Sequence, residues 1–436
     1  TGTQNTLIGG LAGDAITTAN ENTAIGYTAL SANTTAAGNT AVGSRSLLAT
    51  TTGATNAGLG KDTLAANTTG ASNVAVGASA LASNTTAANN TAVGKSALLL
   101  NTTGASNVAV GSGALDANTT ASNNTAMGDG SLGANTTGAS NTAVGKDALL
   151  VNTTASNNTA LGFQSLRLNT TGSVNTASGT YALATNTTGA SNVAMGYNSL
   201  GANTTAPNNT AVGFRALEAN TTGSENTAVG RLSLDDNTTG TNNVAIGNSA
   251  LSANTTANYN VAVGDNTLQA NTTGAQNTAL GALAGDAITT GAENSAVGYM
   301  SLSASTTGSG NVAVGKSALS SDTQGSSSTA VGQLALSSQN LTSATEAQNT
   351  AVGNQAGRYI TSGVQNVLLG GLATTDAADN DRAIVIGYNV SGTQDYTTLG
   401  NAANDIRAAH GTATWATVSD QRYKKDIVDS TAGLSF

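Results

Sequence analysis

The pattern of apolar and polar positions repeats every 17 residues along most of the chain. In the clearest copy, residues 73–86, the run Asn-Val-Ala-Val-Gly is followed by Leu81 and then by Asn-Thr-Thr. The glycine of this run recurs from Gly9 to Gly332 in 19 steps of 17 residues without a slip. Repeats of a short fixed length are typical of solenoids, because an insertion would break the stacking of one coil on the next.

Within one coil, Val74 and Val76 alternate with Ala75, a period of two that predicts a short, half-buried strand. Gly77 permits a tight corner, and Leu81 is expected to enter the core from a second side. No window shows the apolar stripe of a helix. We therefore predict an all-β parallel β-solenoid, or β-roll, with two short strands in each 17-residue coil.

Stacking of identical coils places like residues over like, so the sequence predicts ladders of asparagine. The ladder that begins Asn22, Asn39, Asn56 is expected to join one coil to the next by side-chain hydrogen bonds. Charged residues gather one or two and five or six positions after the glycine, as at Lys61 and Asp116, so these turns are expected to face solvent.

The alanine two positions before each glycine is almost invariant between copies. We interpret this small residue as the surface against which another chain's backbone packs. One Val and one Leu per coil bury ~3–6 kcal/mol of apolar surface, whereas ordering 17 residues costs on the order of 25 kcal/mol. A lone thin coil therefore looks underfilled, and we predict an intertwined or side-by-side homotrimer.

The repeat divides the chain into three parts. Residues 1–387 form the predicted shaft, in which the next glycine after Gly332 is Gly353, so residues 333–348 are expected to bulge outward as a loop. Three coils lack the usual leucine and carry isoleucine three positions later, at Ile16, Ile288 and Ile360. Residues 388–418, with Trp415, are interpreted as a neck or cap, and residues 419–436 as the start of a further domain.

The runs Asn-Thr-Ala-Val-Gly and Asn-Val-Ala-Val-Gly resemble the head repeats of trimeric autotransporter adhesins. The resemblance covers residues 1 to about 390 and implies a trimeric parallel β-roll. The repeats of that family are usually shorter, so the resemblance implies the trimer more directly than the shape of the coil.

The segment Ser-Asp-Gln-Arg-Tyr-Lys-Lys-Asp-Ile at residues 419–427 resembles the opening of the intramolecular chaperone auto-processing domain of phage tail fibres and endosialidase tailspikes. The resemblance implies self-cleavage between Val418 and Ser419, with Ser419 as nucleophile, Lys424 as base, and Asp420 and Arg422 in support. A lysine in an apolar setting can accept a serine proton without histidine. The alternative is an ordinary surface turn that starts a helix. The match covers about 18 residues, so activity is expected only in a longer chain.

Four aromatic residues fall on the solvent turn of successive coils: Phe163, Tyr181, Tyr197 and Phe214. Exposed aromatic strips can bind sugars, so these residues are a candidate glycan-binding strip. The alternative is that like side chains stack and stabilise the solenoid.

Composition excludes several classes of function. The net charge is −9 with no basic run, which argues against nucleic acid as a partner, and no stretch approaches a membrane span. Cysteine is absent and His410 is the only histidine, so we expect no metal and no cofactor. The chain lacks an initiating Met and a signal-like start, which indicates a fragment or a processed chain.

These observations favour the shaft of a homotrimeric extracellular fibre, a phage or viral tail fibre in host attachment, whose partners are its own copies and a host-surface receptor or glycan. The alternatives are a bacterial surface adhesin of the same architecture and an ice-binding solenoid. Adjacent threonines such as Thr85 and Thr86 point to opposite sides, unlike the Thr-x-Thr of flat ice-binding faces. No external substrate is expected, and the only enzymatic activity predicted is self-cleavage.

Overall fold

The computed structural model describes residues 2–402, 404–411 and 416–417, and all of its regular structure is β. The chain forms two compact units, residues 1–245 and 246–436. Each unit is a parallel β-solenoid with coils of about 17 residues, about 23 coils in all. The predicted fold class is therefore confirmed.

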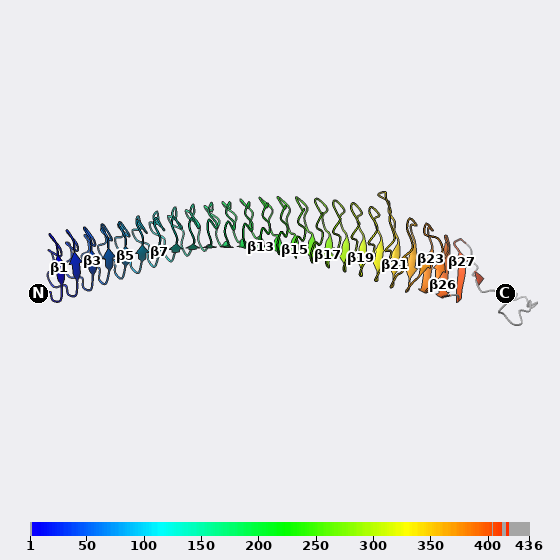
Figure 1. Cartoon of the computed structure of the whole chain (residues 1–436), viewed down its shortest axis with the longest axis horizontal. Coiled ribbons are helices and arrows are strands. Elements are labelled where there is room, and N and C mark those ends of the chain that lie inside the picture. Colours follow the sequence, from blue (N-terminus) through cyan, green and yellow to red (C-terminus); the bar gives the residue numbers. More distant parts are fainter. Residues whose placement is uncertain (1, 403, 412–415, 418–436) are drawn as a thin grey trace, which may run out of the picture. The chain divides into compact units, whose positions relative to one another are not determined.

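The first unit contains one three-residue strand per coil, and each strand pairs in parallel with the strand of the next coil, as Ala143 does with Ala160 (Figure 1). Its strands are β1 (Thr6–Ile8), β2 (Thr23–Ile25), β3 (Thr40–Val42), β4 (Ala57–Leu59), β5 (Val74–Val76), β6 (Thr91–Val93), β7 (Val108–Val110), β8 (Thr125–Met127), β9 (Thr142–Val144), β10 (Thr159–Leu161), β11 (Thr176–Ser178), β12 (Val193–Met195), β13 (Thr210–Val212) and β14 (Thr227–Val229).

Strand β15 (Val244–Ile246) lies at the boundary, and the second unit continues the same coil. Its strands are β16 (Val261–Val263), β17 (Thr278–Leu280), β18 (Ser295–Val297), β19 (Val312–Val314), β20 (Thr329–Val331), β21 (Thr350–Val352), β22 (Val367–Leu369), β23 (Thr374–Thr375), β24 (Ile384–Tyr388), β25 (Ser391–Gly392), β26 (Tyr396–Asn401), β27 (Asn404–Ala409) and β28 (Ala416–Thr417).

The regular coil has one strand and not the two that the sequence predicted. The segment around the core leucine is a turn, and the leucine itself takes a left-handed backbone conformation, with φ of 51° at Leu149 and 50° at Leu166. Such a conformation is unfavourable for a leucine. It is maintained because the turn buries the side chain completely, at 0% exposure in both residues.

The interpretation of the alanine surface was wrong. The alanine at the middle of the strand points into its own coil and is fully buried, as at Ala75, Ala143 and Ala160. The residues on either side of it point outward, and Val74 is 38% exposed. The coil is so narrow that only a small side chain fits between the strand and the leucine turn, which explains why alanine recurs there.

Two asparagine ladders fill much of the core in place of apolar side chains. In the predicted ladder, Asn39 N–H donates to Asn22 Oδ1 at 2.9 Å, and the Asn22 amide donates to the carbonyl of Ala36. In the second, Asn152 Nδ2 donates to Asn135 Oδ1 at 2.8 Å. The predicted role of the first ladder in joining coils is confirmed.

The three coils without leucine keep the core filled by a compensating exchange. In the second unit, Gly285 occupies the leucine position, and a Cβ added there would lie 2.9 Å from Ile288 Cδ1. Ile288 stands where most coils have the second-ladder asparagine, and it is fully buried. The isoleucine therefore fills the space that the leucine leaves.

The predicted bulge is present in the second unit, but it is shorter than expected. Strand β20 still pairs in register with β21 across the insertion. Gln339 and Ala347 are fully buried, and the exposed residues between them are 342–344 and 346, with Leu341 also buried. Only these few residues leave the coil, and they protrude near β21 (Figure 1).

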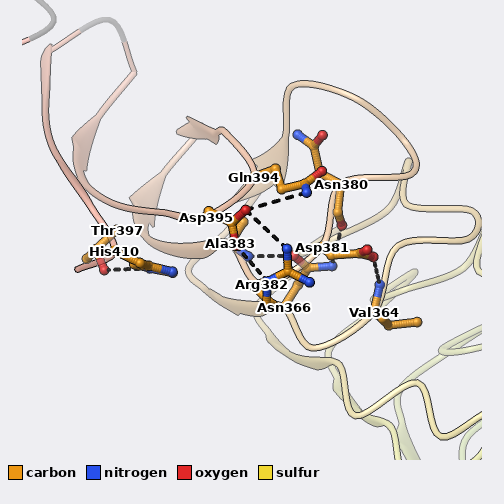
Figure 2. Close-up of polar contacts among 10 residues, drawn as sticks. All are labelled: Val364, Asn366, Asn380, Asp381, Arg382, Ala383, Gln394, Asp395, Thr397 and His410. Atoms are coloured by element: carbon orange, nitrogen blue, oxygen red, sulfur yellow. Dashed lines mark hydrogen bonds and ion pairs between the residues drawn. The ribbon is translucent and has the colours of Figure 1, made fainter. Parts of the chain in front are cut away.

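The solenoid of the second unit ends in an antiparallel hairpin. Strand β26 pairs in parallel with β24, and β27 then runs antiparallel to β26. Figure 2 shows the polar contacts at this end, where Arg382 binds Asp395 through two hydrogen bonds of 2.6 and 3.1 Å. This ion pair lowers the pKa of the Asp395 carboxyl below its usual value, chiefly through the hydrogen bond from Arg382. The predicted cap at residues 388–418 thus begins as a change from parallel to antiparallel pairing.

Candidate functional site

Two surfaces of the solenoid could carry function. The first is the turn edge, which we define as the six residues after each repeat glycine. It carries the charged side chains, as predicted, and Lys61 and Lys95 are exposed there. The second is the strand face, which we define as the outward residues that flank the central residue of each strand.

The four predicted aromatic residues do lie together on the turn edge of the first unit. The ring centroids of Phe163 and Tyr181 are 5.5 Å apart, those of Tyr181 and Tyr197 are 6.2 Å apart, and both pairs are edge-to-face. Tyr197 and Phe214 are stacked, with an interplanar angle of 14° and a centroid distance of 5.5 Å. Contacts of this kind are worth about 0.5–1.5 kcal/mol each. Since the rings contact one another in sequence, the geometry favours the stacking alternative over a strip of free ring faces.

An ion cluster lies beside this aromatic ladder. Arg215 contacts the carboxylate of Glu218 and lies 3.5 Å from Asp235, and the Asn198 amide donates to Glu218 at 2.6 Å. Burial raises the pKa of Asp235 to about 6; the nearby guanidinium opposes this shift, and the carboxylate of Glu218 adds to it. The cluster therefore contains one carboxyl group that titrates near neutral pH.

This titration gives a testable pH dependence. Because folding raises the pKa of Asp235 from 3.8 to about 6, the folded state binds more protons than the unfolded state in that window. The free energy of unfolding of this region should therefore rise as the pH falls from about 6 to about 4. We expect Asp235→Asn to remove a contribution on the order of 1 kcal/mol, after allowance for solvent screening.

The comparison is urea unfolding of the wild type and Asp235→Asn at several pH values. Asp236→Asn serves as the control, because the neighbouring Asp236 is exposed. An identical pH slope in the wild type and Asp235→Asn would contradict the assignment.

The turn edge is also hollowed where coils carry glycine. In the first unit a shallow hollow of about 550 Å³ is lined by Asp116, Asp129, Gly130, Gly133 and Leu150, among others. A Cβ added at Gly133 would lie 3.4 Å from Leu150 Cδ1, so the absence of side chains creates the hollow. Burial raises the pKa of the Asp116 carboxyl above its usual value.

The strand face is apolar and was not anticipated. Its first column consists mainly of Thr and Val, and its second of Val, Ile, Leu and Met, with Ser178 as an exception. Met127, Leu161 and Met195 are 44, 40 and 45% exposed. The sequence held a signal for this surface, because the second column varies in size between copies as an outward position does, whereas the central alanine does not vary.

The structure gives no support for a metal centre. In the described ranges, no three His, Asp or Glu side chains are grouped as metal ligands would be. His410 is exposed, and its Nε2 lies 3.3 Å from the Thr397 hydroxyl (Figure 2). Nor do the described residues include a helix with the length and hydrophobicity needed to cross a bilayer.

The predicted self-cleavage site lies outside the described residues. This holds for Val418, Ser419, Asp420, Arg422 and Lys424, and also for Trp415. Their roles stay predictions of the sequence.

Comparison with known proteins gave no matching family model, no similar curated protein and no similar solved structure. The fold is therefore established by the coil itself, and the function is argued from its surfaces.

Proposed function

We propose that this chain is the shaft of a homotrimeric extracellular fibre, such as a phage or viral tail fibre, that carries host-binding elements. The observation that supports the proposal is the repetition of one coil whose core is held by continuous, fully buried amide ladders. Each asparagine binds the neighbouring coil in both directions, as Asn135 binds Asn118 and Asn152. This construction gives stiffness along the direction of stacking and requires no catalytic cluster.

The test is the mass and protease resistance of the purified chain. We expect light scattering to give the mass of three chains, and trypsin and proteinase K to leave residues 1–387 intact. A monomer that is cut within the coils would overturn the proposal. Binding of the fibre to host cells or their glycans would then separate an attachment fibre, or the surface adhesin of the same architecture, from a purely structural one.

Self-cleavage by the segment at residues 419–436 is a separate part of the proposal. In a chain extended beyond Phe436, we expect a new amino terminus at Ser419, because a serine with a lysine base can attack the preceding peptide bond. Mass spectrometry should find this product in the wild type, and neither Ser419→Ala nor Lys424→Ala should yield it. Unchanged cutting in Ser419→Ala would remove the claim.

The ice-binding alternative depends on a regular column of exposed threonines, which the structure does contain. The second Thr of each Asn-Thr-Thr triplet is exposed in successive coils, as at Thr137, Thr154 and Thr171. The first Thr donates its hydroxyl to the next coil's carbonyl, as Thr136 does to Thr153 at 3.0 Å. Only one column is therefore free on this side of the coil, and we expect no thermal hysteresis in solutions of the chain.

A further inference from the structure

The strand face of the first unit is a continuous surface without charge. It is formed by 14 strands with two outward residues each, or 28 side chains, between Thr6 and Val229. None of these positions carries a charged side chain, whereas the turn edge of the same coils carries Lys, Arg, Asp and Glu. Exposed apolar surface of this extent marks an interaction site.

We propose that copies of this chain pack against one another through the strand face. This inference rests on the proposed oligomeric shaft and names the surface that holds the copies together. It replaces the alanine surface, which is buried inside each coil.

The period of the surface identifies the partner as a second copy. The outward side chains recur once per coil, at the ~4.8 Å spacing of paired strands. A partner can match such a surface along all 14 strands only if it has the same spacing, and another copy of the same coil has it. The absence of charge also gives an oppositely charged partner nothing to recognise.

The size of the surface is sufficient for a stable complex. Stable interfaces use roughly 20–30 residues on each side, and the strand face of this unit alone offers 28. Its outward side chains remain substantially accessible in the single chain, as the 40% exposure of Leu161 illustrates. Packing two sheets face to face would bury them, as in a β-sandwich.

The test places charge on the strand face of every second coil. We expect the triple variant Met127→Lys, Leu161→Lys, Met195→Lys to fall from the oligomer to the mass of one chain, with its β-sheet circular dichroism unchanged. The matched control is Thr137→Lys, Thr171→Lys, Thr205→Lys, which adds the same charge to the exposed threonine column of the same coils. The control should keep the oligomeric mass.

A second measurement covers the case in which the triple variant does not fold. Because the chain contains no cysteine, a single thiol can be placed at will. In the assembled protein, a maleimide should label Leu161→Cys at least tenfold more slowly than Thr171→Cys.

The outcomes separate this inference from the proposed function. If the wild type is oligomeric but the strand-face lysines leave its mass unchanged, or if Leu161→Cys is labelled as fast as Thr171→Cys, the strand face is not the interface and the shaft proposal stands. If the wild type is a monomer at micromolar concentration, both fail.

Discussion

Replacing Gly145 by alanine is expected to destabilise its coil by ~3 kcal/mol or more, the largest effect of any single change considered. A Cβ at this position would lie 2.5 Å from the carbonyl oxygen of Gly162 in the next coil, and φ is +135°. Neither coil can move away without lengthening the parallel strand pairs beside it. The measurement is native-state hydrogen exchange, in which the amides of residues 142–166 should lose protection.

The matched control is Gly113→Ser, also on the turn edge of the first unit. Gly113 has φ of +63°, but Ser96 takes φ of 59° at the equivalent position of the preceding coil, and an added Cβ would come no closer than 3.8 Å to Asp116 Oδ2. We expect a change within about 0.5 kcal/mol. Equal protection in Gly145→Ala and the wild type would show that close glycine stacking does not limit the coil.

Replacing Asn135 by alanine is expected to cost about 2–4 kcal/mol. The fully buried Asn135 amide donates to Asn118 Oδ1 at 3.1 Å and to the Gly138 carbonyl at 2.9 Å, and Asn135 Oδ1 accepts from Asn152. Alanine leaves these partners buried without their hydrogen bonds. Because ladder bonds polarise one another, the loss should spread to both neighbouring coils.

Thr137→Ala in the same coil is the control, since Thr137 is exposed, and it should change stability by less than about 0.5 kcal/mol. Hydrogen exchange again gives the local readout, because stability in repeat proteins is close to a sum over neighbouring coils. If both variants lose the same protection, the buried ladder contributes no more than a surface threonine.

The candidate sites were predictable to different degrees. The grouping of Phe163, Tyr181, Tyr197 and Phe214 follows directly from the repeat, because residues one coil apart must lie side by side. The orientation of the rings does not follow, since it depends on the torsion angles that each side chain adopts beside its neighbours. The raised pKa of Asp235 was equally hidden, because it arises from the burial of a turn residue that the pattern places in solvent.

The sequence by itself determined the coil, its length and the identity of its ladders, because a 17-residue period leaves stacked coils as the only arrangement that places each Asn39 over an Asn22. Only the tertiary structure decided which side of the strand faces inward. Alternation in Val74-Ala75-Val76 fits either choice, and the outcome depends on the width of the coil, which the leucine turn sets. Since that turn leaves room for alanine alone, the larger residues face outward and form the strand face.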